Sequence, residues 1–482
     1  MGVAVATVPW GVILIILPLL GALACFLWPT AVRSLGLVTM FAVVLSVAGL
    51  AARLITTGAY RHTVGGWGAP LGIELFADGL SLLMLAATAV VGFAISIYST
   101  GYFQARQLAR FWPLWLFLLA ALNALFLSAD IFNLYVTLEL TGLAAVALTT
   151  LSGGRDALIA AMRYLLATLL GSLSYLLGVA LIYHSFGSVD IAILAQRVAS
   201  SPAVWSALAL MSAGLALKTA LFPLHFWLPP AHASAPAPVS AVLSALVVKA
   251  SFYILLRLWI EVFPTGRGAL AELFGLLGVA AILWGGLQAL RATRLKLLIA
   301  NSTVMQVGYL FLAFPLAVPT AWRGALYLLL SHAFAKAAMF LAAGNIIRFA
   351  GHDRIADLDR IAQRLPLTLA AFALAGVSIM GLPPSGGFVA KWLMVAASLN
   401  SGQWWWALAL ILGSLLAAAY VFKVIGHAFT QAEVLHASKR VPAVMEWTAL
   451  ALASAAILLG LIALWPLTWM EIGGPFPGIS AR

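Results

Sequence analysis

Apolar residues fill most of the chain in long uninterrupted runs, and short segments between the runs carry most of the charges. About fourteen runs are long enough to cross roughly 30 Å of hydrocarbon as helices. They begin near Trp10, Ala31, Leu82, Phe111, Ile131, Leu158, Ala203, Val239, Gly268, Leu297, Ala321, Pro366, Trp404 and Val441. Most connections are short, which favours one compact bundle. The pattern predicts an all-α polytopic membrane protein.

Prolines interrupt two of the predicted spans. Pro223 breaks the seventh span, within LALKTALFPLHFWLPPAHASAPAPVS, and Pro383 and Pro384 break the twelfth, within ALAGVSIMGLPPSGGFVAKWLMV. An ordinary proline kink explains either break alone. Two breaks five spans apart, each with a lysine in the same helix, instead favour an inverted repeat of two five-helix units. In transporters with this architecture, such breaks mark the ion path.

The repeat also predicts how the chain is divided. Spans 4–8 form one unit and spans 9–13 the other. The expected parts are an N-terminal three-helix segment at 1–110, a first repeat at 111–260, a second repeat at 268–430, and a C-terminal helix with its tail at 441–482.

Basic residues are distributed unequally between the two sides of the predicted bundle. Connections after odd-numbered spans hold fifteen: Arg33, Arg106, Arg110, Arg155, Arg163, Arg291, Arg294, Lys296, Arg348, Arg354, Arg360, Arg364, Lys423, Lys439 and Arg440. Connections after even-numbered spans hold seven: Arg53, Arg61, Arg197, Arg257, Arg267, Arg323 and Arg482. Because cytoplasmic loops are enriched in Lys and Arg, both termini are expected on the outer side of a cell's inner membrane.

Composition excludes several classes of protein. The chain is 64% hydrophobic and 8% charged, against about 25% charged residues in a soluble domain. The net charge of +12 is spread over short loops, so it indicates topology rather than a nucleic-acid partner. The single cysteine, Cys25, cannot hold an iron–sulfur cluster by itself. Phosphate-loop and dinucleotide motifs are absent, so we expect no cofactor, no metal and an energy source outside this chain.

Five charged residues lie well inside apolar runs: Glu139, Lys218, Lys249, Lys336 and Lys391. A lysine facing lipid would cost roughly 2.5–3.5 kcal/mol. The four lysines would together cost on the order of 10 kcal/mol, so they must face inward, toward water or partners. Glu139 needs an inward partner for the same reason, and Lys218 is the natural candidate.

Burial gives such lysines a chemistry that surface lysines lack. An apolar environment disfavours the protonated amine and a nearby carboxylate favours it again. A Glu–Lys contact that opens and closes is therefore a switch of proton affinity. The alternative is a static buried ion pair that fastens two helices. Four separate lysines and one glutamate favour proton transfer.

Three histidines accompany these lysines. His332 and Lys336 are four residues apart, so they share one helical face, and a histidine there can relay a proton. His225 and His232 flank the broken seventh span and are possible accessory groups. For all three, the alternative is a structural histidine bonded to a neighbouring carbonyl.

Four stretches resemble one known family: ADIFNLYVTLEL, ALKTALFPLHFWLPPAHASAPAPVSAVLSALVVKASFYILLR, SHAFAKAAMFLAAGNI and GLPPSGGFVAKW. The family comprises the antiporter-like membrane subunits of respiratory complex I, membrane-bound hydrogenases and multi-subunit Mrp cation/proton antiporters. The resemblance implies that Glu139 pairs with Lys218 and that Lys249 is the central proton carrier. It also implies that His332, Lys336 and Lys391 continue the path.

Within the family, the chain looks most like the D subunit of Mrp antiporters, because Lys391 follows the GLPP break. The resemblance implies partners in the form of other membrane subunits, and transport of protons with Na⁺ or K⁺. The alternative is a proton-pumping subunit of a complex I-like NADH:quinone oxidoreductase or of a hydrogenase. A quinone- or haem-binding redox subunit and a pure scaffold are further alternatives. The chain alone is not expected to be an enzyme.

Overall fold

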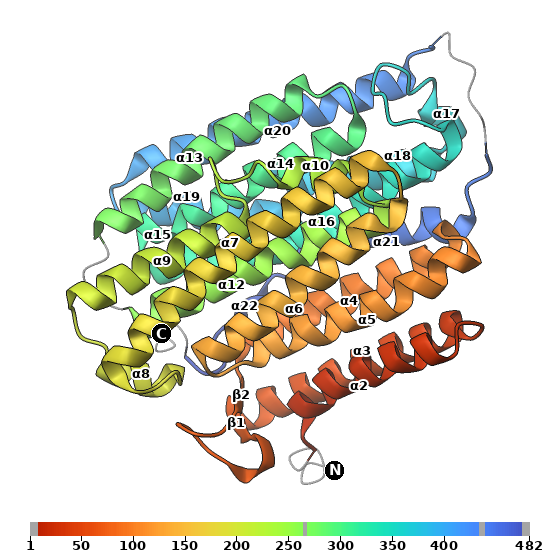
Figure 1. The fold of residues 1–482 in the computed structure, drawn as a ribbon. Coiled ribbons are helices and arrows are strands. Elements are labelled where there is room, and N and C mark those ends of the chain that lie inside the picture. The colour runs from red at the N-terminus through yellow and green to blue at the C-terminus, as the bar shows by residue number, and fades with distance from the viewer. Residues whose placement is uncertain (1–7, 264–267, 433–438, 475–482) are drawn as a thin grey trace.

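Long helices run side by side through the molecule (Figure 1). The computed structural model describes residues 8–263, 268–432 and 439–474. Within these ranges, twelve helical segments are long and apolar enough to cross a membrane. They are α2 (Trp10–Leu27), α3 (Val32–Thr57), α4 (Gly79–Tyr102), α5 (Ala105–Leu127), α6 (Ile131–Thr149), α7 (Arg155–Phe186), the segment Ala237–Val262, α13 (Gly268–Arg291), α14 (Leu295–Phe311), α16 (Pro319–Ala350), α20 (Trp404–Phe429) and α21 (Ala443–Leu461). The prediction of a polytopic helical membrane protein is confirmed.

The two other predicted spans are those that contain the prolines, and each consists of two shorter helices. The seventh comprises α9 (Pro202–Thr219) and α10 (Leu228–Ser234). The twelfth comprises α18 (Pro366–Met380) and α19 (Gly386–Asn400). Both breaks are where the prolines predict them. The count of fourteen spans and the inverted repeat stay predictions.

The first halves of these two broken helices end alike. α9 ends at Ala220 (φ 59°) and α18 at Gly381 (φ 80°), both in the left-handed region. The next N–H then bonds back five residues, from Leu221 to Ala216 and from Leu382 to Val377, each over 3.0 Å. This ending satisfies carbonyls that the helix would leave free. Ala220 lacks the conformational freedom of glycine, so its position stores local strain.

The eighth span is helical but not uniform. It begins as α11 (Ala237–Val242), widens into a π turn, η3 (Leu243–Val247), continues as α12 (Val248–Arg257) and ends in a second π turn, η4 (Leu258–Val262). Such turns interrupt the regular hydrogen-bond ladder and are frequent at functional sites. The sequence pattern gave no indication of them.

A small β-hairpin between α3 and α4 departs from the all-α expectation. β1 (Tyr60–Thr63) pairs antiparallel with β2 (Glu74–Ala77), with Tyr60 opposite Ala77. The Arg61 guanidinium on β1 lies 3.1 Å from a carboxylate oxygen of Asp190, the residue just before the short helix that begins at Ile191. Strands of four residues are too short for alternation to be recognised. The remaining short elements are α8 (Ile191–Arg197), α15 (Ala313–Leu316), α17 (Ile361–Arg364), α22 (Leu464–Trp469), η1 (Val64–Gly66) and η2 (Thr150–Ser152).

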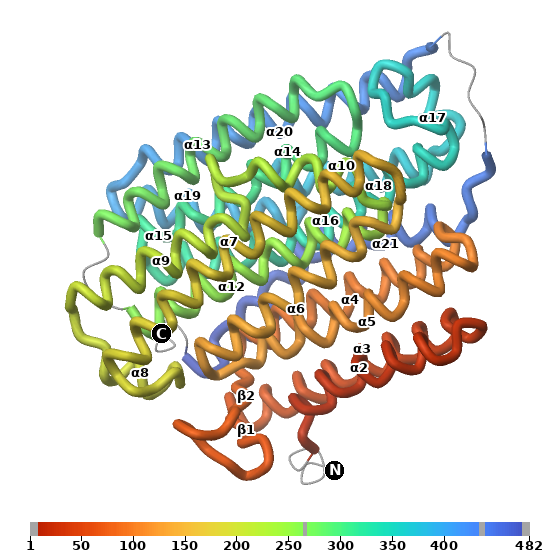
Figure 2. The backbone as a smooth tube through the Cα atoms, in the orientation of Figure 1, coloured from red at the N-terminus to blue at the C-terminus, as the bar shows by residue number. Residues whose placement is uncertain are grey.

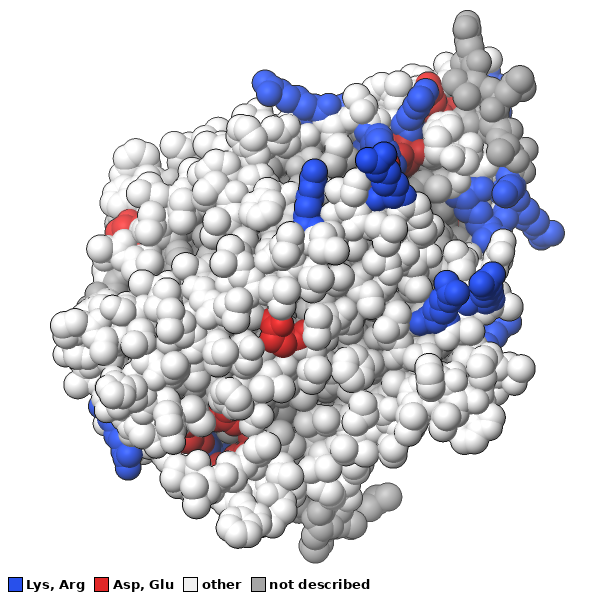
Figure 3. All heavy atoms as spheres, viewed as in Figure 1, with Lys and Arg blue, Asp and Glu red and all other residues white. Residues whose placement is uncertain are grey.

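The outer surface of the bundle is apolar between two polar ends. On α7, the exposed leucines Leu166, Leu170, Leu173 and Leu177 follow one another at helical spacing. In Figure 3 the visible face is a broad band with few charges, and Lys and Arg gather at the end where Figure 1 places α17. The band is the surface expected against lipid.

The core lies around α16 and the segment Ala237–Val262, whose most apolar windows are fully buried. Helices distant in sequence surround them. α13 and α20 lie side by side, as the tube in Figure 2 shows. Lys249 and Lys336, which lie on the segment Ala237–Val262 and on α16, are therefore near the centre of the molecule.

Candidate functional site

Glu139 on α6 and Lys218 on α9 form the expected contact. The Lys218 amine lies 3.3 Å from a Glu139 carboxylate oxygen, and the side chains of Lys218 and Glu139 are 4% and 17% exposed respectively. Close packing of α7 on α9 positions the lysine: a Cβ at Gly171 would lie 2.8 Å from the Gly214 carbonyl and 3.0 Å from Lys218 Cγ. Only glycine at 171 permits this approach.

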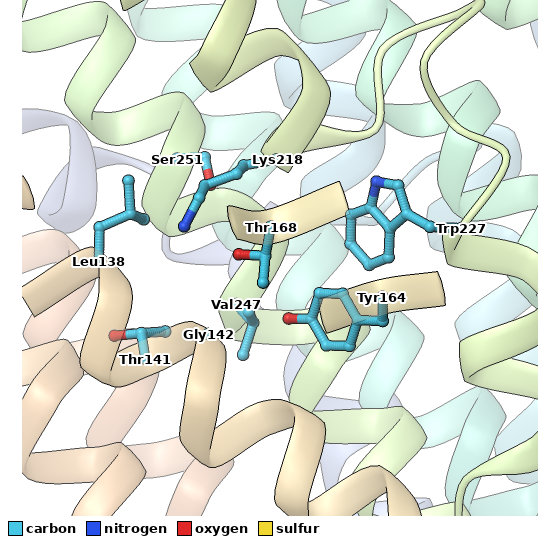
Figure 4. Close-up of a pocket in the computed structure, with 9 residues that line it drawn as sticks. All are labelled: Leu138, Thr141, Gly142, Tyr164, Thr168, Lys218, Trp227, Val247 and Ser251. Carbon is cyan, nitrogen blue, oxygen red and sulfur yellow. The ribbon is translucent and has the colours of Figure 1, made fainter. Parts of the chain in front are cut away.

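A small cavity adjoins the Lys218 amine (Figure 4). Its volume of ≈ 10 Å³ is about that of one water probe. It is lined by Leu138, Thr141, Gly142, Tyr164, Thr168, Lys218, Trp227, Val247 and Ser251. The Thr141 hydroxyl is buried and has no partner among the described residues. Lys218 therefore has hydroxyl groups beside it as well as a carboxylate, and Ser251 brings α12 to the same cavity.

Trp227 completes the break after Lys218. Its indole N–H donates to the Leu217 carbonyl over 2.9 Å, and its ring stacks on Tyr164 at 4.4 Å. The Leu217 carbonyl, at the end of α9, thus accepts from the indole as well as from the Ala220 N–H (3.1 Å). This contact fixes the backbone next to Lys218.

Lys249 lies on α12 directly after the π turn and is 1% exposed. In that turn the Val248 N–H bonds to the Leu243 carbonyl, five residues back, instead of to Ser244. The Ser244 carbonyl then accepts a hydrogen bond from the Lys249 amine over 2.6 Å. The irregular backbone supplies the partner that a regular helix would withhold.

His332 and Lys336 both point into the core from α16 and are 3% and 0% exposed. The Lys336 amine donates to the Ile299 carbonyl over 2.8 Å and to the Ser302 hydroxyl, both on α14. His332 Nε2 is buried without a partner among the described residues. The charges of Lys249, Lys336 and Lys391 all lie close enough to act on its ring, so His332 lies near all three lysines.

Lys391 on α19 turns back toward the break that precedes it. Its amine donates to the Ile379 carbonyl (3.0 Å) and the Met380 carbonyl (3.2 Å) at the end of α18. It also donates to the Ser414 hydroxyl (3.0 Å) and lies 4.5 Å above the Tyr309 ring. A cation at the carbonyl end of a helix is electrostatically favourable.

The two accessory histidines differ. His232 on α10 is fully buried, neither ring nitrogen has a partner in the described chain, and Lys249, Lys296 and Lys336 lie within electrostatic reach. His225 is half-buried in the break and stacks on Phe222 at 5.5 Å. No lysine charge among the described residues acts on the His225 ring, so of the two accessory histidines the structure brings only His232 near the lysines.

Two residues counted above as loop cations are buried. Lys296, at the start of α14, is 3% exposed and donates to the Ala233 carbonyl (3.1 Å) and the Ala235 carbonyl. It lines a polar cavity of ≈ 330 Å³ together with Asp353. Arg257, on α12, is 2% exposed. The sequence pattern misses both because each lies near the end of an apolar run.

Arg257 belongs to a buried ionic cluster at the far end of α12. It donates to both carboxylate oxygens of Asp78 (2.6 and 2.8 Å) and to Glu261 (2.6 Å). This bidentate geometry is the strong form of such a pair. Two others of the seven basic residues counted after even-numbered spans, Arg267 and Arg482, lie outside the described residues.

The six side chains Glu139, Lys218, Lys249, His332, Lys336 and Lys391 are called the central row below. They lie on α6, α9, α12, α16 and α19. Glu139 contacts Lys218, α9 packs against α12, the π turn before Lys249 packs against α16, and α16 packs against α19. The six ionisable groups therefore lie on helices that pack one against the next, from one broken helix to the other.

Fold and central row together define a class: many-helix membrane proteins whose interior holds ionisable groups on neighbouring helices. The profile of the family described as NADH:quinone oxidoreductase/Mrp antiporter, transmembrane region, matches residues 128–417. A second profile, described as the N-terminus of complex I chain 5, matches residues 64–112. The chain belongs to the NADH:quinone oxidoreductase/Mrp antiporter family, and the resemblance inferred from its motifs is confirmed.

Individual relatives come from both branches of this family. The chain is 38% identical to the N subunit of the NADH-quinone oxidoreductase of Desulforudis audaxviator, over 87% of this chain and 86% of that one. It is 27% identical to the D subunit of the Na⁺/H⁺ antiporter of Bacillus subtilis, over 86% of each chain. A chain of the Mrp complex from Dietzia sp. superposes with a TM-score of 0.89 at 26% identity, covering 99% of this chain and 98% of that one. The protein is an antiporter-like membrane subunit of this family.

Proposed function

We propose that this subunit carries protons through the membrane along the central row. The observation that supports this proposal most strongly is the arrangement of Lys218, Lys249, Lys336 and Lys391 on helices that pack in sequence. A single buried lysine is compatible with a structural role. A row of them, two beside helix breaks and one after a π turn, matches the way ion paths are built in membrane transporters.

The contacts of the lysines suit proton transfer. Lys249, Lys336 and Lys391 each donate to main-chain carbonyls. A carbonyl accepts a hydrogen bond from an ammonium and from a neutral amine alike. Each of these lysines can therefore gain or lose a proton without losing its partner. Only Lys218 has a carboxylate partner among the described residues of the row, so Glu139 is the group whose movement would change the charge balance.

His332 and Lys336 form the middle of the proposed path. An imidazole accepts a proton on one nitrogen and releases one from the other. His332 lies near Lys249, Lys336 and Lys391, and its Nε2 has no hydrogen-bond partner within the described residues. We assign His332 the transfer between the eighth and eleventh spans, with His232 as a second group of the same kind.

The driver of transport has two candidates. Identity of 38% to the N subunit of a quinone oxidoreductase supports a redox-driven parent complex of the complex I type. The lysine after the GLPP break and the match to the D subunit of an antiporter support cation/proton antiport of the Mrp type. In either case the parent complex lies in the inner membrane, and the basic residues favour both termini on its outer side.

Inverted membrane vesicles that contain the intact complex separate these candidates. Acidification of the lumen is followed with a pH-sensitive dye after addition of NADH or hydrogen, and after addition of Na⁺ or K⁺ to vesicles with a preformed proton gradient. Acidification on addition of an electron donor indicates the redox-driven type, and collapse of the gradient by a cation indicates antiport. If no condition gives proton movement that is lost when this chain is deleted, proton carriage is contradicted.

A further inference from the structure

A group of polar side chains lies between the last two lysines of the central row. Lys336 on α16 reaches the Ser302 hydroxyl on α14. Lys391 on α19 reaches the Ser414 hydroxyl on α20 and lies 4.5 Å above the Tyr309 ring. Neither α14 nor α20 supplies a lysine or histidine of the central row, yet both place polar groups against it.

α14 presents these groups on one face. Ser302, Gln306 and Tyr309 are spaced by four and three residues, so they share a face of the helix, and all are almost fully buried. Gln306 donates to the Ile379 carbonyl (3.3 Å), the same carbonyl that accepts from Lys391. This face therefore runs from the partner of Lys336 to the partner of Lys391.

α20 completes the group with Tyr420 and Ser414. The Tyr420 side chain lies beside Ser302 and Gln306, and the Tyr309 side chain lies beside Ser414 and Tyr420. A Cβ at Gly413 would lie 2.2 Å from the Tyr309 hydroxyl oxygen. Glycine at 413 thus leaves the room that this hydroxyl occupies.

Three polar atoms in the group are buried and make no hydrogen bond of good geometry with the described residues, although Ser302, Gln306 and Ser414 lie close by: the Tyr309 and Tyr420 hydroxyls and the Gln306 side-chain carbonyl. Four other buried tyrosine hydroxyls, those of Tyr98, Tyr175, Tyr253 and Tyr327, donate to main-chain carbonyls. Tyr175 donates to the Ile131 carbonyl over 3.1 Å, and Tyr98 donates to the Leu341 carbonyl over 2.9 Å. Clustered unpaired polar groups are where proteins hold internal water. The Tyr309 and Tyr420 hydroxyls, which lack such a bond, lie in the interval between Lys336 and Lys391.

We propose that Ser302, Tyr420, Tyr309 and Ser414, with water held by Gln306, form a hydroxyl relay that passes protons between Lys336 and Lys391. One N–H bond breaks at the donor lysine and one forms at the acceptor. Each hydroxyl or water between them receives one proton and releases another, so none changes its charge overall. The inference rests on the proposed function, since a relay has a role only if both lysines exchange protons.

A purely structural role for the two tyrosines predicts different behaviour. Their rings fill space between α14, α19 and α20, and phenylalanine would fill it equally well. Removing the hydroxyls would then leave transport unchanged, and would even relieve unpaired polar atoms. A relay role predicts the opposite: packing is kept and proton transfer is lost.

The test uses Tyr309→Phe, Tyr420→Phe and their double variant in the intact complex, with Tyr175→Phe as the matched control. Transport is measured in inverted vesicles and normalised to assembled complex. We expect each relay variant to slow transport at least about tenfold. This is less than the roughly 10²–10⁴-fold typical of a removed acid or base, because water partly replaces a hydroxyl. The solvent deuterium isotope effect should rise as the transfer becomes rate-limiting, and Tyr175→Phe should change neither quantity.

Gly413→Ala tests the same relay with both tyrosines retained, because the added methyl group displaces the Tyr309 hydroxyl. It should slow transport and raise the isotope effect as Tyr309→Phe does. Lys336→Met and Lys391→Met separate the two levels of inference. If they abolish transport while the tyrosine double variant transports normally, the relay is wrong and the proposed function stands. If both methionine variants transport normally, the proposed function itself fails.

Discussion

Lys249, Lys336 and Lys391 are buried and have hydrogen-bond partners that tolerate a change of charge. Three of the four lysines donate to main-chain carbonyls. The carbonyl that Lys249 uses lies in the π turn, and the one that Lys391 uses lies beside the helix break. Lys218 differs, because it has Glu139. A buried charge that loses its only counter-ion is strongly destabilised. The Glu139–Lys218 pair is therefore the point in the row where a small movement has the largest electrostatic effect.

Substitution of Glu139 tests this point. We expect Glu139→Ala to abolish proton transport and Glu139→Asp to reduce it less, because the shorter carboxylate keeps the charge. Loss of one partner of a buried pair can cost about 3–5 kcal/mol, so assembled complex is quantified beside transport. Glu272→Ala, which removes an exposed carboxylate on α13, is the control. Normal transport by well-assembled Glu139→Ala would rule out a switch at this pair.

For single residues, the sequence predicts an inward-facing position where a charged residue lies within an apolar run. Lys218, Lys249, Lys336 and Lys391 could be predicted to face inward because a charge within an apolar run is costly. Lys296 could not, because it follows loop residues and its carbonyl partners come from a distant segment. The Tyr309 and Tyr420 hydroxyls gave no signal, since tyrosine is common in membrane helices.

At the scale of helices, the breaks and the close contacts between helices position the central row. α9 ends just beyond Lys218, and α7 approaches it so closely that the Gly171 and Gly214 backbones meet. Small residues at such crossings are typical of helix packing in membranes. The contact holds Lys218 toward α6, where Glu139 lies.

Enlarging Gly171 should disturb this geometry. The Cβ of Gly171→Ala would meet the Gly214 carbonyl and Lys218, so α7 and α9 must separate. Overpacking of this kind typically costs about 1–3 kcal/mol. We expect a lower melting temperature of the purified complex and slower transport. Gly426→Ala on α20, where a Cβ meets nothing within 4 Å, should be neutral or slightly stabilising. Equal melting temperatures for the two variants would contradict the packing role.

Elements that depend on one local residue type could be predicted, and the others could not. The breaks in the seventh and twelfth spans follow from prolines, which cannot continue a helix. The π turn before Lys249 contains no proline or glycine that would signal it, and it packs against α16. The hairpin of β1 and β2 is too short to show a period. The division into two repeats stays a prediction.

For the whole molecule, the distribution of basic residues is the main signal of orientation. Lys and Arg gather at the end where α17 lies, and α8 lies at the opposite end (Figures 1 and 3). By the positive-inside rule, we expect the α17 end to face the cytoplasm. The apolar band between the two ends agrees with a chain that lies almost entirely within the membrane.

Cysteine labelling tests this orientation. The native Cys25 is buried in α2 and is replaced by alanine, and single cysteines are introduced at two exposed positions, Arg354 before α17 and Arg197 in α8. A membrane-impermeant maleimide added to intact cells should label position 197 and leave position 354 unlabelled. Inverted vesicles should give the reverse pattern. Labelling of position 354 in intact cells would contradict this orientation and would indicate the opposite one.

The central claim is that the Lys249 proton is exchanged during turnover, and paired substitutions at Lys249 test it most directly. Lys249→Arg keeps a permanent positive charge, since the arginine pKa exceeds about 12, and Lys249→Met removes the charge permanently. A group that must alternate between protonated and neutral forms is lost in both. We therefore expect both variants to abolish proton-gradient formation in inverted vesicles, normalised to assembled complex. Substantial transport by the Lys249→Arg complex would contradict the claim and leave Lys249 a structural cation.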